Sequence, residues 1–389
     1  MRAYITKIAV LAVSLVASLF LVEFLLWALT KAGVLPSYKT ESAGKFYDDK
    51  LGYRIPPFAL PEIDANGFRN PSVPERADIV GIGDSMTYGY NALSQDSWVY
   101  ELGRKTDLSV YSVSIGGGDP PQYLLLLDEA LKLNPSAIVL GLYLGNDIAG
   151  SCYFTRELDF WRSYAEEKGI DVADCLNKSD DLWPEGQVPQ DTKGEEQSFF
   201  SAVRGSYLVS FVKNIYPIKK AVWERRAKDL ARESDDFYLV RDPAFDILFD
   251  YNRSRFIDRN HPAIRNSYEI TKTLFSEMAK KLERNQKLFV VFIPTKENVF
   301  YDYLVQNNYA VPEVHRFFVE AQRSIVADLS DYFESIGIAS VDTRPFLEKR
   351  IQSKNPPLYL EFNRDDHPTR VGYEAIAEAA AESFFLKER

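Results

Sequence analysis

The 389-residue chain has few of the side chains that build metal and redox sites, with two cysteines, three histidines and three methionines. The spacing and neighbours of the cysteines, Cys152 and Cys175, do not resemble a zinc site, so we expect neither a metal nor another cofactor. In an oxidising compartment these two residues could pair as a disulfide, and two buried thiols would also fit the sequence.

Basic side chains are scarce relative to acidic ones. The chain has 46 Lys and Arg against 56 Asp and Glu, a formal net charge of −10, which argues against a nucleic-acid partner. It also lacks internal repeats and long low-complexity tracts. A hydrophobic content of 46% and an aromatic content of 14% are enough for a sizeable core, and they indicate one elaborated globular domain.

One long apolar run stands at the N-terminus. Residues 8–30 contain a single charged side chain, Glu23, and at ~1.5 Å per residue the run matches a hydrocarbon core of ~30 Å. We therefore expect an N-terminal transmembrane helix within an anchor at residues 1–31. Arg2 and Lys7 precede the run, so the N-terminus should be cytoplasmic and the rest of the chain periplasmic or extracellular.

Two features accompany this expected anchor. A carboxylate at the depth of Glu23 is costly, and it either contacts a membrane protein partner or is protonated or directed to the outer interface. Residues 32–77 contain six prolines and many aromatics. This composition indicates an extended juxtamembrane arm that connects the anchor to the domain or lies along its surface.

Strand-like and helix-like patterns alternate over residues 78–389. Apolar runs at 78–82, 110–115, 137–144, 287–293 and 337–342 are typical of buried strands, and helical patterns separate them. The alternation predicts right-handed crossovers and a doubly wound parallel sheet of the α/β class. It lapses between Ser151 and Asn285, which marks a helical insertion at about residues 151–285.

Polar residues follow three of these strands and should gather at the carboxyl edge of the sheet. Gly83-Asp84-Ser85 follows the first strand, a glycine-rich turn with Gly116 the second, and Gly145-Asn146-Asp147 the third. Asp365-Asp366-His367 precedes the last helical pattern. The turn with Gly116 and the segment Gly145-Asn146-Asp147 also fit an ordinary loop or cap, and a Gly-Asp-Ser tripeptide occurs by chance in many proteins.

A serine hydroxyl is a poor nucleophile until an imidazole accepts its proton. His315 lies in a helix-start pattern and His261 in a polar loop of the insertion, so His367 is the better base for Ser85. The side-chain amide of Asn146 could donate to a developing oxyanion.

In order and spacing, these four segments resemble the blocks of the SGNH (GDSL-type) hydrolase superfamily. The resemblance covers about residues 64–385, and residues 65–70 are similar to a segment that precedes the serine block in membrane-anchored members. It implies a three-layer α/β/α sandwich with a five-stranded parallel, flavodoxin-like sheet. It also implies that Ser85 is the nucleophile, that His367 is the general base, and that the N–H of Ser85 and the side chain of Asn146 line an oxyanion hole.

Two positions depart from the family pattern. Many relatives complete the oxyanion hole with a glycine N–H of the second block, but here Ser114 occupies that position and Gly116 comes two residues later. Which amide donates stays open, because only a backbone N–H is required. The triad aspartate often lies three residues before the histidine, where this chain has Arg364. Some membrane-anchored relatives carry it two residues before, which selects Asp365.

Asp366 is a weaker candidate for the triad acid than Asp365, because adjacent residues of an extended segment point in opposite directions.

The resemblance implies a membrane-anchored serine esterase that acts on O-acyl, especially O-acetyl, esters of cell-surface glycans through a Ser-His-Asp acyl-enzyme. Three alternatives stay open: an O-acetyltransferase for an exported polysaccharide, a non-catalytic glycan-binding or scaffold protein, and a lipase or thioesterase for long acyl chains.

Overall fold

The computed structural model describes residues 2–31, 45–178, 182 and 216–385. Its centre is a five-stranded sheet with the order β4-β3-β5-β8-β9, in which all neighbours are parallel. This is the strand order of flavodoxin-like folds. The predicted parallel α/β sheet is confirmed. Its strands are β3 (Ile79–Gly83), β4 (Val110–Ser114), β5 (Ala137–Tyr143), β8 (Lys287–Ile293) and β9 (Ala339–Asp342).

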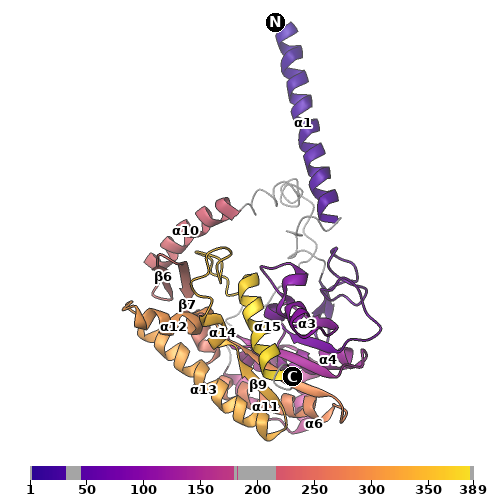
Figure 1. Ribbon diagram of the computed structural model, residues 1–389, viewed down its shortest axis with the longest axis vertical. Coiled ribbons are helices and arrows are strands. Elements are labelled where there is room, and N and C mark those ends of the chain that lie inside the picture. Colours follow the sequence, from indigo (N-terminus) through magenta and orange to yellow (C-terminus); the bar gives the residue numbers. More distant parts are fainter. Residues whose placement is uncertain (1, 32–44, 179–181, 183–215, 386–389) are drawn as a thin grey trace.

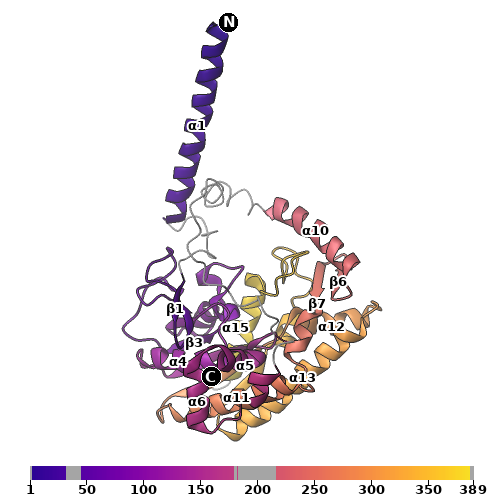
Figure 2. The ribbon, with the colours of Figure 1, turned by 180° about the vertical axis from the view of Figure 1, so that it is seen from behind.

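Both faces of the sheet are covered by helices, which is why its central strands are apolar runs rather than alternating patterns. Every residue of β3 and β5 is buried. The chain moves outward from β3 to β4 and then back to β5, so right-handed crossovers place α3 (Trp98–Thr106) and α4 (Pro120–Leu131) on opposite faces. α3 packs against α15 (Arg370–Phe384), and α4 packs against α11 (Pro262–Lys280). Figures 1 and 2 show the molecule from these two sides.

The other described helices of the domain lie in the connections between strands, except α14 (Arg344–Glu348), which follows the last strand. They are α2 (Ser85–Tyr88), α5 (Asp147–Glu157), α6 (Asp159–Lys168), α7 (Ala173–Asn177), α10 (Tyr216–Glu233), α12 (Lys296–Gln306), α13 (Glu313–Ser335) and α14, with 3-10 turns at Ser94–Asp96 and Tyr251–Phe256. Several begin directly after a strand of the central sheet. Their first residues therefore lie at the carboxyl edge, where the polar segments were expected.

Two antiparallel hairpins lie outside the central sheet. β1 (Phe46–Asp48) pairs with β2 (Gly52–Arg54) in the predicted arm, and β6 (Phe237–Arg241) pairs with β7 (Asp246–Asp250) in the predicted insertion. The first hairpin is attached to the domain, because Leu51 in its turn is buried and the indole of Trp161 donates to the Lys50 carbonyl at 2.8 Å. The described part of the arm thus lies along the domain surface.

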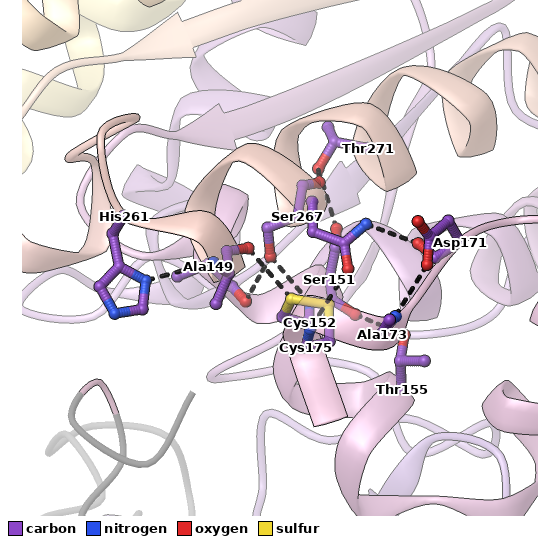
Figure 3. The surroundings of a disulfide bond; sticks show 12 residues. Ala149, Ser151, Cys152, Thr155, Asp171, Ala173, Cys175, His261, Ser267 and Thr271 are labelled. Atoms are coloured by element: carbon purple, nitrogen blue, oxygen red, sulfur yellow. Dashed lines mark hydrogen bonds between the residues drawn. A yellow bond between two sulfur atoms is a disulfide. The ribbon is translucent and has the colours of Figure 1, made fainter. Parts of the chain in front are cut away.

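A disulfide joins Cys152 of α5 to Cys175 of α7 (Figure 3). Next to it, the hydroxyl of Ser267 on α11 donates to the carbonyl of Ala149 on α5 at 3.0 Å. These contacts tie α5 to two other helices. Because α5 begins directly after Asn146, they also hold the segment that carries this candidate residue.

Residues Arg2–Lys31 form the helix α1. The side chains at 2–6, 8, 9, 12, 30 and 31 lie outside the description, and many of the others are apolar and exposed, as Leu11 and Phe20 are at 73% each. Among the described residues, and in contrast to the expectation for residues 8–30, no helix is both long and apolar enough to cross a membrane.

Candidate active site

Ser85 is the first residue of α2, a one-turn helix directly after β3. Asp84 caps this helix, because one carboxylate oxygen accepts an amide of the first turn at 2.8 Å and the other accepts the Ser85 hydroxyl at 3.2 Å. The helix ends at Gly89, whose φ of 84° is left-handed. A Cβ on Gly83 would lie 2.1 Å from Oγ1 of Thr87, so the glycine lets the short helix fold back against the strand end. The local sequence therefore fixes the serine at the sheet edge.

His367 and Asp365 are paired within one short loop. Nδ1 of His367 is hydrogen-bonded to Oδ1 of Asp365, and the same oxygen accepts the backbone amide of His367 at 3.0 Å. Burial opposes ionisation of Asp365, but the charge and hydrogen bonds of His367 outweigh it and lower the pKa of this carboxyl. Nε2 of His367 is buried and has no hydrogen-bond partner among the described residues. Asp365 thus orients the imidazole and leaves its second nitrogen free.

Asp366 points away from His367 and into the protein. Its side chain is 1% exposed and forms ion pairs with Nζ of Lys296 at 3.0 Å and Nε of Arg253 at 2.7 Å. It also accepts the hydroxyl of Tyr143 at 3.0 Å. Burial alone would raise the pKa of Asp366, but the charges of Lys296 and Arg253 keep it below its usual value. This carboxylate anchors the loop and does not contact the imidazole.

Lys296 binds the backbone carbonyls of the same loop. The ammonium group is completely buried and donates to the carbonyls of residues 363, 364 and 365 at 3.1, 3.0 and 3.3 Å. Lys296 is the first residue of α12, which begins shortly after β8 ends at the sheet edge. In the structure it is the cation around which the histidine loop folds.

Ser85 and His367 come to the same edge without a direct hydrogen bond. The Ser85 hydroxyl donates to Asp84 instead. Burial raises the pKa of Asp84 to about 6, while the charge of His367 opposes the rise, so the imidazole acts on the carboxylate that Ser85 contacts. Hydrogen bonds between a nucleophile and its base are often long or absent without substrate, so the missing bond between Ser85 and His367 does not exclude this pair.

Several donors at this edge have no acceptor among the described residues. Those of interest are the backbone amides of Ser85 and Gly116 and the side-chain amide of Asn146. The amide of Ile115 donates to the Gly83 carbonyl at 3.2 Å. Because N–H groups alternate in direction along a strand, the amide of Ser114 points away from β3. By position along the strand, Ser114 and Gly116 both lie on the side away from β3, and either amide is a candidate second-block donor of an oxyanion hole.

Two tyrosines enclose the turn at Gly116. The hydroxyl of Tyr53, from the hairpin of the arm, donates to the Gly116 carbonyl. A Cβ on Gly116 would lie 2.7 Å from the hydroxyl of Tyr90, and the Tyr90 ring lies 5.1 Å from the His367 ring, centroid to centroid. Sequence reasoning missed both tyrosines, because neither belongs to a motif.

A second group of carboxylates is buried near Ser85. The charges of Asp84, Asp119 and Asp147 act on one another, and burial together with this repulsion raises the pKa of Asp119 and Asp147 well above the usual value. Asp147 accepts the hydroxyl of Tyr123 and the amide of Tyr143, each at 2.8 Å. Raised pKa values mean that this group carries less negative charge than three free aspartates would.

The two other histidines have partners elsewhere. His315 is buried between the hydroxyl of Tyr251 at 3.0 Å and the carbonyl of Glu297 at 2.8 Å, and burial lowers its pKa to about 4. His261 accepts the amide of Ala263 at 3.2 Å and caps α11. In the part of the chain that the structure describes, no cluster of His, Cys, Asp and Glu could hold a metal ion.

No family model and no curated protein matches the chain. Similar solved structures include the lipase Lip_vut3 from a goat rumen metagenome, with 13% identity over 80% of this chain and 99% of that one and a TM-score of 0.36. A putative lipolytic protein of the G-D-S-L family from Desulfitobacterium hafniense has 13% identity, a TM-score of 0.34 and coverages of 79% and 98%. A gut microbial diltiazem-metabolizing enzyme has 11% identity, a TM-score of 0.34 and coverages of 80% and 47%. Such low TM-scores do not identify a family.

Proposed function

We propose that the protein is a serine ester hydrolase with Ser85 as nucleophile, His367 as general base and Asp365 as the residue that orients the imidazole. One observation carries the proposal. Nδ1 of His367 is bonded to Asp365 while Nε2 is buried without a partner, at the sheet edge where Ser85 begins a helix. An imidazole in this tautomer accepts a proton at Nε2.

In the proposed reaction the Ser85 side chain rotates from Asp84 toward His367 and attacks the ester carbonyl. His367 takes the hydroxyl proton and then gives it to the leaving alcohol. The amide of Ser85, a second-block amide and the side chain of Asn146 stabilise the tetrahedral oxyanion. Water then attacks the acyl-enzyme, with His367 again as base, and releases the acid.

The substrates we propose are O-acetyl esters of cell-surface glycans, with the enzyme domain in the periplasm or outside the cell. The proposed membrane anchor is the apolar run at residues 8–30, of which the side chains at 8, 9, 12 and 30 lie outside the described part that holds no spanning helix. The resemblance of residues 65–70 to membrane-anchored relatives, the exposed apolar side chains of α1 and the disulfide support this setting. Transfer of the acetyl group to a polysaccharide would use the same acyl-enzyme. A contact of Glu23 with a membrane protein partner stays a prediction.

Replacing Ser85 by Ala tests the chemistry. We expect hydrolysis of p-nitrophenyl acetate to fall by ~10³-fold or more, because the covalent step is lost, and labelling by a fluorophosphonate to disappear. Ser335→Ala, at an exposed helical serine that bonds only a carbonyl of its own helix, should change neither. Unchanged turnover and labelling in Ser85→Ala would refute the proposal, and a scaffold protein would instead bind envelope polymers without turnover in the wild type.

Cell fractionation tests the location. The full chain should sediment with membranes and resist extraction at high salt, and a chain without residues 1–31 should not. Acetate released from purified envelope polymers, compared with hydrolysis of longer acyl esters, would separate a glycan deacetylase from a lipase or thioesterase. Recovery of the full chain in the soluble fraction would remove the anchor from the proposal and leave the chemistry intact.

A further inference from the structure

The loop that follows the nucleophile helix is fixed by side chains from distant segments. Arg69 donates to the carbonyls of residues 88, 89 and 92 at 3.0, 2.8 and 2.9 Å. The hydroxyl of Tyr373 on α15 donates to the carbonyl of residue 90 at 2.8 Å. Four of the five carbonyls between residues 88 and 92 are therefore held by side-chain donors, which is unusual for a surface turn.

Arg69 is itself fixed. Its side chain is 7% exposed, and its guanidinium forms an ion pair with Glu62 at 2.9 Å. A planar guanidinium that is buried and bonded on several sides has little freedom to move. The segment that precedes the serine block thus acts as a rigid support for the loop.

Asn91 is the residue that this support presents to the histidine loop. Its φ of 65° lies in the left-handed region. Nδ2 donates to Oδ2 of Asp365 at 3.0 Å and to the carbonyl of His367 at 3.1 Å. One amide thereby joins the loop of the nucleophile to the loop of the base, across 274 and 276 residues of sequence.

The two oxygens of Asp365 have separate partners. Oδ1 bonds the imidazole and the amide of His367, and Oδ2 bonds Asn91. A carboxylate held at both oxygens cannot rotate about its Cβ–Cγ bond without breaking a bond, so the direction of its bond to the imidazole is set. The amide also donates to the charged form of Asp365 and helps to keep its pKa low, after His367.

We propose that Asn91 is a positioning residue for the reaction: it fixes the Asp365 carboxylate and the His367 backbone relative to the segment that carries Ser85. The inference rests on the proposed esterase function. It differs from a turn role, because a turn at this φ is equally well served by glycine, which lacks the amide.

The test uses Asn91→Gly in the full chain, with Asn308→Gly as the matched control. Asn308 is exposed, has a φ of 59° and lies in the turn after α12, so both substitutions keep a left-handed backbone. We expect Asn91→Gly to lower kcat for p-nitrophenyl acetate about tenfold with little change in KM, since misorientation affects the transition state more than substrate binding. Asn308→Gly should keep the wild-type values.

A spectroscopic readout separates positioning from general damage. In the wild type the Nδ1 proton of His367, bonded to Asp365, should give a downfield proton NMR signal, assigned by its loss in His367→Ala. We expect this signal to shift or broaden in Asn91→Gly and to stay in place in Asn308→Gly. Asn91→Asp, which also tolerates the left-handed turn, places a second carboxylate against Asp365 and should lower kcat further than glycine does.

The outcomes are distinct. Wild-type kcat and an unmoved signal in Asn91→Gly would overturn the positioning role and leave the esterase function in place. Equal losses in Asn91→Gly and Asn308→Gly, with unmoved signals, would assign the effect to turn stability and also overturn it. Turnover in Ser85→Ala equal to wild type would instead remove the function on which the inference rests.

Discussion

Two groups of aspartates lie at the candidate site, and their pKa values move in opposite directions. Near Ser85, burial raises the pKa of Asp84, and burial together with repulsion from neighbouring aspartates raises the pKa of Asp119 and Asp147. At the histidine loop, positive partners overcome burial and lower the pKa of Asp365 and Asp366. The difference is in the partners, since His367, Lys296 and Arg253 contact the second group.

This difference suits the proposed chemistry. An imidazole that becomes positive in the transition state is stabilised by ionised carboxylates beside it. An oxyanion that forms at Ser85 would be repelled by the same charges, and raised pKa values reduce them there. The same residue type thus serves two purposes, because the neighbouring side chains decide whether it is ionised.

The largest effect should follow removal of the cation from the histidine loop. Lys296→Met leaves Asp366 buried without its ammonium partner, and breaking such a pair costs ~3–5 kcal/mol of the free energy of unfolding. Lys281→Met breaks an exposed ion pair with Asp128, whose side chains are 37% and 52% exposed, and should cost only ~0–1 kcal/mol. Urea unfolding of both variants measures the contrast, and equal midpoints would show that the buried pair does not stabilise the loop.

A smaller effect with a defined pH dependence is expected at Asp84. Its pKa of about 6 lies above the ordinary value of 3.8, so the folded state binds this proton more tightly than the unfolded state. The resulting stabilisation is present below about pH 4 and is lost as the pH rises through 6.

Asp84→Asn removes this titration. Relative to wild type, the variant should therefore gain stability between pH 4 and pH 7, by on the order of 2–3 kcal/mol. Urea unfolding of both proteins at several pH values gives the difference. A difference that stays constant over this range would show that Asp84 is not the titrating group, and that the aspartates near Ser85 do not behave as described.

Much of the sheet could be predicted from the sequence, because its strands are continuous apolar runs and their order follows from alternation and family resemblance. The positions of Ser85 and Asn146 at strand ends follow from the same pattern. The sequence also favours Asp365 over Asp366 as the partner of His367. In an extended segment, residues two positions apart point the same way and adjacent residues point in opposite directions.

The supports of the site could not be predicted in this way. Asn91 and Tyr53 form bonds to residues that are distant in sequence, and neither spacing nor composition marks them. Arg69 lies in the segment 65–70 that the resemblance includes, but the resemblance does not give its contacts. Whether Ser114 or Gly116 supplies the second-block amide depends on the backbone directions just after β4, which the sequence does not give. Local sequence patterns therefore predict the candidate reactive groups, whereas the contacts that hold them in place join residues far apart in the sequence.

The position of Arg69 limits how far the protein can be shortened. A fragment that starts at the first strand of the sheet, residue 79, keeps every reactive group but loses the guanidinium that braces residues 88–92 and the phenol at Gly116. Recombinant versions for kinetic work should begin before residue 45. Under the proposed function, a shorter fragment would show low activity although Ser85, His367 and Asp365 are all present.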